Sequence, residues 1–297
     1  AAQGLGRAGE PGSKSVMSSL RLLITGGSGY LGRHLVRNVA AGRSESFRYT
    51  TFRADPLGLP QGEQLDLRDG PAVTRFVADF APDAVIHTAG SNRTPDMTAV
   101  IVEGTRHIVA ASAAAGARLV HLSTDSIFDG TAAPYDEAAA PAPLNEYGQA
   151  KAMAEALVAG HPDAVIVRTS LIYGLEEIDN GTAWMAEALR AGQPVTLFTN
   201  QRRNPVWVET IAAACLELVD HPYRGVLNVA GRQAITRAAF GLRLLDWWGV
   251  TERSSLSLTD DMSGRWPLDC ELDVSLASRL LQTPLRGVDE VFEFNVH

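Results

Sequence analysis

Leu22-Leu23-Ile24-Thr25-Gly26-Gly27-Ser28-Gly29-Tyr30-Leu31-Gly32 is the stretch that decides the fold. It begins as a short apolar run, which predicts a buried strand, and it leads through three glycines into a segment with helical spacing, residues 33–40. Strand, glycine turn and helix in this order are typical of a loop that binds a dinucleotide. Gly26 permits the tight turn, Gly29 lets the backbone approach a pyrophosphate, and Gly32 lets the helix pack closely on the strand. A plain glycine turn is the alternative, and the flanking elements favour the dinucleotide site.

Length, charge and composition bound the class of protein. The 297 residues suffice for one large domain or two modest ones. The formal net charge of −8 argues against a nucleic-acid partner, which requires clustered basic residues. Cys215 and Cys270 are the two cysteines, and their spacing indicates neither a metal site nor a disulfide framework, so we expect free thiols in a reducing, cytoplasmic compartment. No run of about 18 apolar residues predicts a membrane span. Residues 1–19 are expected to be a disordered extension.

Alternating strand and helix patterns follow the glycine stretch. Strands are predicted at residues 47–52, 84–90, 117–125 and 164–168, with a short one closing at Leu65, and helices at residues 71–80 and 97–116. This alternation predicts an α/β fold, a Rossmann-type doubly wound parallel sheet with right-handed crossovers. Beyond Gly174 the alternation loosens. We therefore expect residues 20–173 to form mainly an NAD(P)-binding domain and residues 174–297 mainly a smaller substrate-binding α/β domain, with some elements interleaved.

The end of the second predicted strand bears on the choice between NAD and NADP. A site for NAD usually offers a carboxylate there, for the ribose hydroxyls of the adenosine. Here the strand ends in Phe52-Arg53-Ala54, and no carboxylate appears before Asp55. The Arg53 guanidinium suits a 2′-phosphate, so NADP is favoured and NAD is the alternative, as is a solvated loop arginine. Asp66, with Leu67 after it, is expected either near the adenine or as a turn residue.

Two later strands end where a parallel sheet gathers its chemistry. The strand from Ala84 runs into Ala89 and Gly90, whose small size suits the close approach of a cofactor. His87 alternates within this apolar strand, so we expect a buried, hydrogen-bonded structural histidine. The fifth strand ends in the polar residues 123–125, which places them beside a substrate.

A tyrosine and a lysine four positions apart, Tyr147 and Lys151, share one face of the next predicted helix. A tyrosine hydroxyl has an ordinary pKa of about 10, and a nearby ammonium group is expected to lower it. Tyr147 is then able to exchange a proton with a carbonyl or alcohol oxygen, and Thr124 to hydrogen-bond the same oxygen. A nicotinamide would carry the hydride, and Lys151 would also hold its ribose hydroxyls.

At these residues the chain resembles the extended short-chain dehydrogenase/reductases, and within them the dTDP-4-dehydrorhamnose reductase group. The resemblance is carried by TGGSGYLG at residues 25–32, STDSIFDG at 123–130, YGQAK at 147–151, VRTS at 167–170, NPVWV at 204–208, GVLNVAG at 225–231 and RWP at 265–267. It extends from about residue 20 to the C-terminus.

The resemblance implies an NAD(P)H-dependent reductase of a keto group on a nucleotide-activated deoxysugar, such as dTDP-4-dehydrorhamnose, which could act as a homodimer. The catalytic set that it implies is Thr124, Tyr147 and Lys151, with Asp125 assisting the proton transfer. The cofactor contacts that we expect are Gly26, Gly29, Tyr30, Leu31, Gly32, Arg53, Asp66, Leu67, Ala89, Gly90, Ser123 and Lys151. Substrate contacts are expected from position at Ser91, Trp184, Arg203 and Arg265. The two arginines suit a diphosphate, or they form surface salt bridges instead.

The sequence departs from the pattern of this family at three places. Ile101 stands where the family often has an asparagine that links the lysine to water, Ser126-Ile127 replaces a usual Tyr-Val pair, and the loop at residues 174–182 is acidic.

The same resemblance extends to the regulatory β subunit of methionine adenosyltransferase, so a non-catalytic NADP-binding subunit is one alternative. A nucleotide-sugar epimerase or dehydratase is the other. A dehydratase normally has an acid pair beside the threonine, and the single Asp125 favours simple reduction.

Overall fold

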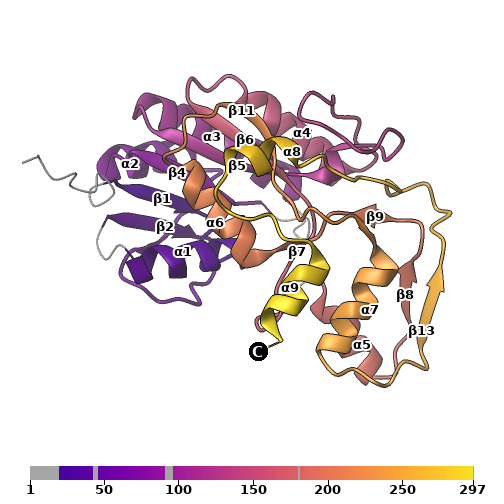
Figure 1. The fold of residues 1–297 in the computed structure, drawn as a ribbon. Helices are drawn as coiled ribbons and strands as arrows, with labels where there is room; N and C mark the ends of the chain where they lie inside the picture. The colour runs from indigo at the N-terminus through magenta and orange to yellow at the C-terminus, as the bar shows by residue number, and fades with distance from the viewer. Residues whose placement is uncertain (1–19, 43–45, 91–95, 180, 297) are drawn as a thin grey trace, which may run out of the picture.

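A twisted parallel sheet covered by helices on both faces forms the larger part of the molecule (Figure 1). A smaller region with its own core lies next to the carboxyl ends of the strands. The structure is a computed structural model, and it describes residues 20–42, 46–90, 96–179 and 181–296. The predicted extension before residue 20 and the predicted substrate residue Ser91 lie outside the described residues.

Seven strands form the central sheet in the order β11-β6-β5-β4-β1-β2-β3, and every neighbouring pair is parallel. The strands are β1 (Leu22–Thr25), β2 (Phe47–Thr51), β3 (Gly62–Gln64), β4 (Ala84–His87), β5 (Arg118–Thr124), β6 (Ala164–Thr169) and β11 (Gly225–Asn228). The chain runs outward from β1 to β3 on one side and from β4 to β11 on the other. The order therefore reverses between β1 and β4, the place where doubly wound sheets bind ligands. The predicted α/β class with a doubly wound parallel sheet is confirmed.

Helices cover the two faces of this sheet. One face carries α1 (Tyr30–Gly42) and α6 (Val208–Leu218), and the other carries α2 (Gly70–Phe80), α3 (Met97–Ala114) and α4 (Glu146–Val158) (Figure 1). Local sequence signals fix two of the helix starts. The Asp69 carboxylate accepts a hydrogen bond from the Ala72 amide at 3.0 Å, and the Asn145 side chain accepts one from the Gly148 amide at 2.9 Å.

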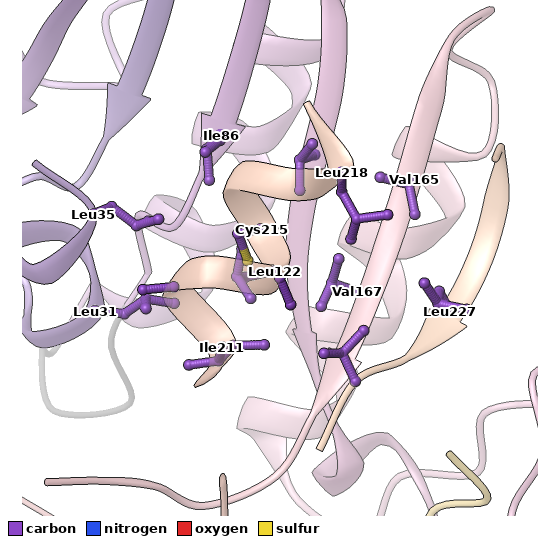
Figure 2. Close-up of a cluster of buried hydrophobic side chains, with 14 of the residues drawn as sticks. Leu31, Leu35, Ile86, Leu122, Val165, Val167, Ile211, Cys215, Leu218 and Leu227 are labelled. Atoms are coloured by element: carbon purple, nitrogen blue, oxygen red, sulfur yellow. The ribbon is translucent and has the colours of Figure 1, made fainter. Parts of the chain in front are cut away.

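The core follows from the two-residue period of the strands. Leu22 and Ile24 face α1 and α6, whereas Leu23 between them faces α2 and α3. The cluster beneath α1 and α6 is apolar throughout, and Figure 2 shows Ile211 and Cys215 of α6 turned onto the strands. Burial of aliphatic side chains on both faces stabilises the sheet by about 25 cal/mol per Å² of apolar surface.

The smaller region packs one sheet and three helices around a second core. Its elements are α5 (Ala183–Arg190), β8 (Val195–Phe198), α7 (Arg237–Trp247), β13 (Leu256–Thr259) and α9 (Val288–Asn295). Two further short pairings stand apart from the seven-stranded sheet: β7 (Ile172–Tyr173) with β10 (Val206–Trp207), and β9 (Arg202–Arg203) with β12 (Ile235–Thr236). The helix α8 (Ser275–Leu280) lies against β11 (Figure 1).

Between the one-turn helix η2 (Asp125–Ile127) and α4, residues 128–145 form neither helix nor strand, apart from an isolated bridge between Tyr135 and Leu272. The third strand ends at Gln64, one residue before the predicted Leu65, and the helix from Met97 ends at Ala114, two residues early. Within the part of the chain that the structure describes, no helix is both long and apolar enough to cross a membrane.

Candidate functional site

A cavity of about 500 Å³ opens between the carboxyl ends of the strands and the smaller region. Several parts of the chain line it: the glycine loop, the segment after β4, the ends of β5 and β6, the start of α4, the segment after β7, and the facing sides of α5 and α7. The lining includes Gly29, Tyr30, Leu31, Gly32, Gly90, Ser123, Thr124, Asp125, Tyr147, Lys151, Ser170, Asp179, Thr182, Met185, Arg237 and Phe240. The residues predicted to be catalytic therefore meet part of the predicted cofactor set at one cavity.

The glycine loop shows what each glycine is needed for. Gly26 has a φ of +72°, and a Cβ placed on it would lie 2.8 Å from the Cα of Ala89. A Cβ on Gly32 would collide with the Gly26 carbonyl oxygen, so α1 approaches the loop as closely as glycine allows. A Cβ on Gly29 would meet the Gly26 oxygen alone, at 3.1 Å, and Gly29 lines the cavity. The first and third glycines thus set the backbone, and the second leaves space beside it.

Tyr147 stands in the first turn of α4, opposite Thr124 at the end of β5. Burial, followed by the negative charge of Asp125, raises the pKa of the Tyr147 hydroxyl to about 12, and a hydrogen bond with the Thr124 side chain opposes this rise. The expectation that Lys151 lowers this pKa is wrong for this structure. The Lys151 ammonium donates instead to the Leu122 carbonyl oxygen. Tyr147 is therefore protonated at neutral pH.

Lys151 is itself buried, with 6% of its surface exposed. Burial lowers the pKa of its ammonium group to about 8, against a usual 10.5, and the Glu155 carboxylate one turn along α4 limits the shift. Glu155 in turn accepts hydrogen bonds from the Arg168 guanidinium at 2.9 and 3.2 Å and from the Ser123 hydroxyl. Lys151 thus stands beside the ion pair of Glu155 and Arg168, and its ammonium group is positively charged at neutral pH.

Two histidines lie behind Lys151 on the face of the sheet that carries α3. His87 hydrogen-bonds Thr25 Oγ1 at 2.6 Å and Thr105 Oγ1 at 3.1 Å, as expected of a structural histidine. The His121 ring lies 5.2 Å from that of His87, and within the described residues neither of its nitrogens has a hydrogen-bond partner. Burial and the Lys151 charge lower the pKa of both rings, that of His87 to about 3. Both rings are neutral, and no local sequence pattern predicted that His87 and His121 lie side by side.

Asp125 is held firmly at the floor of the cavity. Its Oδ2 accepts a hydrogen bond from the Ser170 hydroxyl at 2.6 Å and lies 3.5 Å from Nε of Arg203. Its Oδ1 lies 3.3 Å from the Thr124 hydroxyl. Both carboxylate oxygens are therefore occupied. Ser170 follows β6 directly, so the same strand-end rule that indicated Thr124 was available to find it.

The predicted substrate residues do not gather at the cavity. Arg203 is buried, and its guanidinium donates to the carbonyl oxygens of Pro267 at 2.7 Å and Leu268 at 3.1 Å. Trp184 is 41% exposed, and its indole nitrogen donates to the Gly181 carbonyl at 2.9 Å. Arg265 is exposed. None of these three side chains lines the cavity.

Five of the expected cofactor residues also lie outside the cavity lining: Gly26, Arg53, Asp66, Leu67 and Ala89. Arg53 is exposed, with its guanidinium carbon 5.3 Å from the centroid of the Phe52 ring. Asp66 is bound by Arg68 at 2.7 Å, which holds the pKa of that carboxyl below its usual value. Leu67 is buried in the core beneath α2 and α3. Ala89, as described above, lies against Gly26.

The acidic loop after β7 is matched by basic residues on α1. The Glu177 carboxylate pairs with Arg33 and Arg37, and its carbonyl oxygen accepts a hydrogen bond from the Tyr30 hydroxyl at 2.7 Å. Asp179 accepts one from the Gly181 amide at 2.6 Å. This loop therefore joins the glycine-loop helix to the wall of the cavity formed by α5.

Residues 20–263 match the family described as RmlD substrate binding domain. The chain belongs to this family. The fold that members share is that of the extended short-chain dehydrogenase/reductases, as the sequence predicted. A solved structure titled as a hypothetical dTDP-4-dehydrorhamnose reductase from Sulfolobus tokodaii superposes with a TM-score of 0.78 and 28% identity, over 91% of this chain and 98% of that one.

Two relatives of this chain carry names that describe different roles. The probable low-salt glycan biosynthesis reductase of Haloferax volcanii is 32% identical over 270 residues, which cover 85% of this chain and 89% of the relative. The methionine adenosyltransferase 2 subunit beta of Rattus norvegicus is 28% identical over 298 residues, which cover 92% and 87%. A dTDP-4-dehydrorhamnose reductase of Bacillus anthracis, solved in complex with NADP, shares the fold with a TM-score of 0.77 at 22% identity, over 93% of this chain and 98% of that one.

Proposed function

We propose that this protein is a cytoplasmic, NADPH-dependent reductase of a keto group on a nucleotide-activated deoxysugar. One observation carries the proposal: Thr124 and a protonated Tyr147 line the same cavity as the glycine loop. The named similarity to a glycan biosynthesis reductase and to a dTDP-4-dehydrorhamnose reductase supports the reaction class.

The cofactor fits the glycine loop, because Gly29 leaves its cavity side open to a pyrophosphate and the N-terminus of α1 points its amides there. When bound, the nicotinamide supplies the hydride. Arg53 supports NADP over NAD, since its guanidinium has neither an ion pair nor a hydrogen bond to the described residues and is free for a 2′-phosphate. Lys151, charged at neutral pH, is suited to hold hydroxyl groups of the cofactor ribose.

The protein side chains then handle the proton. Tyr147 donates its hydroxyl proton to the carbonyl oxygen of the substrate as that oxygen gains negative charge, and Thr124 hydrogen-bonds the same oxygen. A raised Tyr147 pKa suits the donor role, which belongs to reduction rather than oxidation. Both oxygens of Asp125 are occupied, so it orders Thr124 and Ser170 rather than acting as the free acid that a dehydratase requires.

The test is NADPH consumption with dTDP-4-dehydrorhamnose and related 4-keto sugars. Tyr147→Phe is expected to reduce kcat by about 10²- to 10⁴-fold while NADPH still binds. The matched control is Tyr223→Phe, because the Tyr223 hydroxyl donates to Val226 O at 2.6 Å and does not line the cavity. Unchanged turnover in Tyr147→Phe contradicts the mechanism.

A second candidate function is a cofactor-binding regulatory subunit. It is supported by the similarity to methionine adenosyltransferase 2 subunit beta, which spans 92% of this chain. Affinity purification of the tagged protein from its own cells distinguishes the two. Stoichiometric recovery of a methionine adenosyltransferase, together with no NADPH oxidation on any keto-sugar offered, favours the regulatory subunit.

A further inference from the structure

Arg237 is a cavity-lining cation that the sequence did not single out. Its main chain is fixed on both sides. The Arg237 amide donates to Gln201 O at 2.8 Å, and the preceding Thr236 caps α7 by accepting from the Ala239 amide at 3.1 Å. Thr236 also pairs with Arg202 across β12 and β9. The guanidinium therefore projects from a rigid helix start.

The Arg237 guanidinium has no hydrogen bond and no ion pair to any residue that the structure describes. The charged groups nearest to it are Arg203 and Asp125, and these two are already paired with each other at 3.5 Å. Ser170 donates to the same Oδ2 of Asp125, and the hydroxyls of Thr124 and Ser126 donate to Oδ1. Because the Arg203 and Asp125 charges nearly cancel, the positive charge of Arg237 is not compensated in this part of the cavity.

The other charged groups on the cavity wall do not compensate it. Asp179 is engaged within its own loop, with Gly181 and Thr182, and its charge acts on Tyr30 at the cofactor side. Lys151 is a second cation, which donates to Leu122 O at the end of β5. Burial and the Arg203 charge lower the pKa of Arg237, and the Asp125 charge opposes this only in part.

A half-buried guanidinium without a partner is unfavourable, and proteins hold such groups where a ligand supplies the counter-charge. A guanidinium presents paired N–H donors that match the oxygens of a phosphate or a carboxylate. Arg237 shares its helix face with Phe240 and Gly241, three and four positions on, and all three line the cavity. The anion site thus adjoins an apolar wall that includes Met185.

We propose that Arg237 binds a phosphate of the nucleoside diphosphate carried by the substrate. Arg237 would thus bind the diphosphate, the role expected from the sequence for Arg203 and Arg265. The Arg203 guanidinium instead donates to backbone carbonyl oxygens, and Arg265 is exposed. The inference rests on the proposed function, because the substrate considered there carries its negative charge on a diphosphate. A carboxylate on the sugar is the other source of the same anionic oxygens.

Calorimetric titration of the full chain, saturated with NADPH, tests this without turnover. The probes are dTDP, UDP, thymidine, uridine and glucuronate. The variants are Arg237→Gln, Arg237→Lys and the control Arg243→Gln. Arg243 lies on the same helix but pairs with Asp289 and does not line the cavity.

Arg237→Gln is expected to weaken binding of the preferred nucleoside diphosphate by about 10- to 100-fold, and Arg237→Lys by less. Nucleoside and NADPH affinities should not change, and Arg243→Gln should bind like the wild type. Equal diphosphate affinity in Arg237→Gln overturns the inference. The inference is also overturned if the wild type binds glucuronate through Arg237 but binds neither dTDP nor UDP. It is overturned likewise if the wild type binds none of these anions.

The outcomes separate this inference from the proposed reaction. If diphosphate binding depends on Arg237 but no keto-sugar is reduced, Arg237 keeps its role and the reductase proposal fails. If a keto-sugar is reduced and KM is the same in Arg237→Gln as in the wild type, the reductase proposal stands and the role of Arg237 is refuted.

Discussion

The two faces of the central sheet are buried equally well, but they are built from different chemistry. The face under α1 and α6, called the aliphatic face below, is mostly apolar, with side chains such as Ile86, Leu122 and Val167 (Figure 2), and the buried Arg118 at its α6 end is an exception. The opposite face carries polar side chains near the carboxyl ends of four adjacent strands: Thr25, His87, His121, Ser123 and Arg168. Register places them side by side, since Thr25 pairs with His87, His87 with His121, and Ser123 with Arg168.

The polar side chains converge on one helix. Lys151 and Glu155 of α4 lie over them, and the charges of both are felt by the neighbouring groups. Buried ion pairs are a poor way to gain stability, because the cost of removing both charges from water offsets their attraction. We infer that the aliphatic face stabilises the sheet, whereas the polar face fixes the position and charge of Lys151.

The largest effect is expected on the polar face. Arg168→Met leaves the buried Glu155 carboxylate without its guanidinium, which should lower the free energy of unfolding by about 3–5 kcal/mol. Urea unfolding measures it. Arg224→Met is the control, because its ion pair with Asp163 is exposed and should contribute less than about 1 kcal/mol. Equal losses of unfolding free energy in Arg168→Met and Arg224→Met would mean that the buried ion pair of the polar face contributes no more than an exposed one.

On the aliphatic face the expected loss comes from packing alone. Leu218→Ala in α6 empties a fully buried position and should cost about 2–5 kcal/mol in the same assay. The Arg118 guanidinium donates to the Leu218 backbone carbonyl at 2.8 Å, and the substitution keeps this main-chain acceptor, so the loss should be independent of pH. A pH-dependent loss would show that the substitution disturbs the contacts of Arg118.

The charge of Lys151 should make stability depend on pH. Its folded pKa of about 8 lies below the usual 10.5, so between these values the unfolded chain binds more protons than the folded one. The contribution of this group to the free energy of unfolding therefore rises from pH 8 to pH 10.5, by at most about 1.4 kcal/mol per pH unit. Urea unfolding at pH 7.5 and 9.5 should show this rise in the wild type beyond that in Lys151→Met. The same pH response in both proteins contradicts it.

The smallest effect is expected at His121. Both ring nitrogens lack a partner, so His121→Leu removes no hydrogen bond to the described residues and should change the free energy of unfolding by less than about 1 kcal/mol. His87→Leu should cost more, because Thr25 and Thr105 each lose a partner. A loss above about 2 kcal/mol for His121→Leu would mean that a bridging water satisfies the ring.

Local patterns predicted the parts of the site that neighbouring residues build. The glycine loop, the polar end of β5 and the Tyr147–Lys151 spacing each lie within one strand–turn–helix segment. The roles of the arginines depend on partners far along the chain. Arg203 has the right chemistry for an anion, but carbonyl groups at residues 267 and 268 occupy it. Nothing near Arg237 in the sequence indicates that it faces the cavity.

The Tyr147 pKa could not be inferred from spacing for a similar reason. Four positions along a helix place Tyr147 and Lys151 on one face, but they do not say which acceptor the lysine reaches. The Lys151 ammonium donates to the Leu122 carbonyl, and burial together with the Asp125 charge raises the pKa of Tyr147.

The sheet also constrains how the protein is made. The edge of β6 is covered by β11, and one face of the sheet by α6, yet both elements come after the first strands of the smaller region. A nascent chain that has been translated only as far as β6 exposes an open strand edge and the aliphatic surface around Val165. Chains emerge from the ribosome at about 5–20 residues per second, so this surface stays open for several seconds before Gly225–Asn228 arrive. Chaperones therefore have a defined interval in which to bind it.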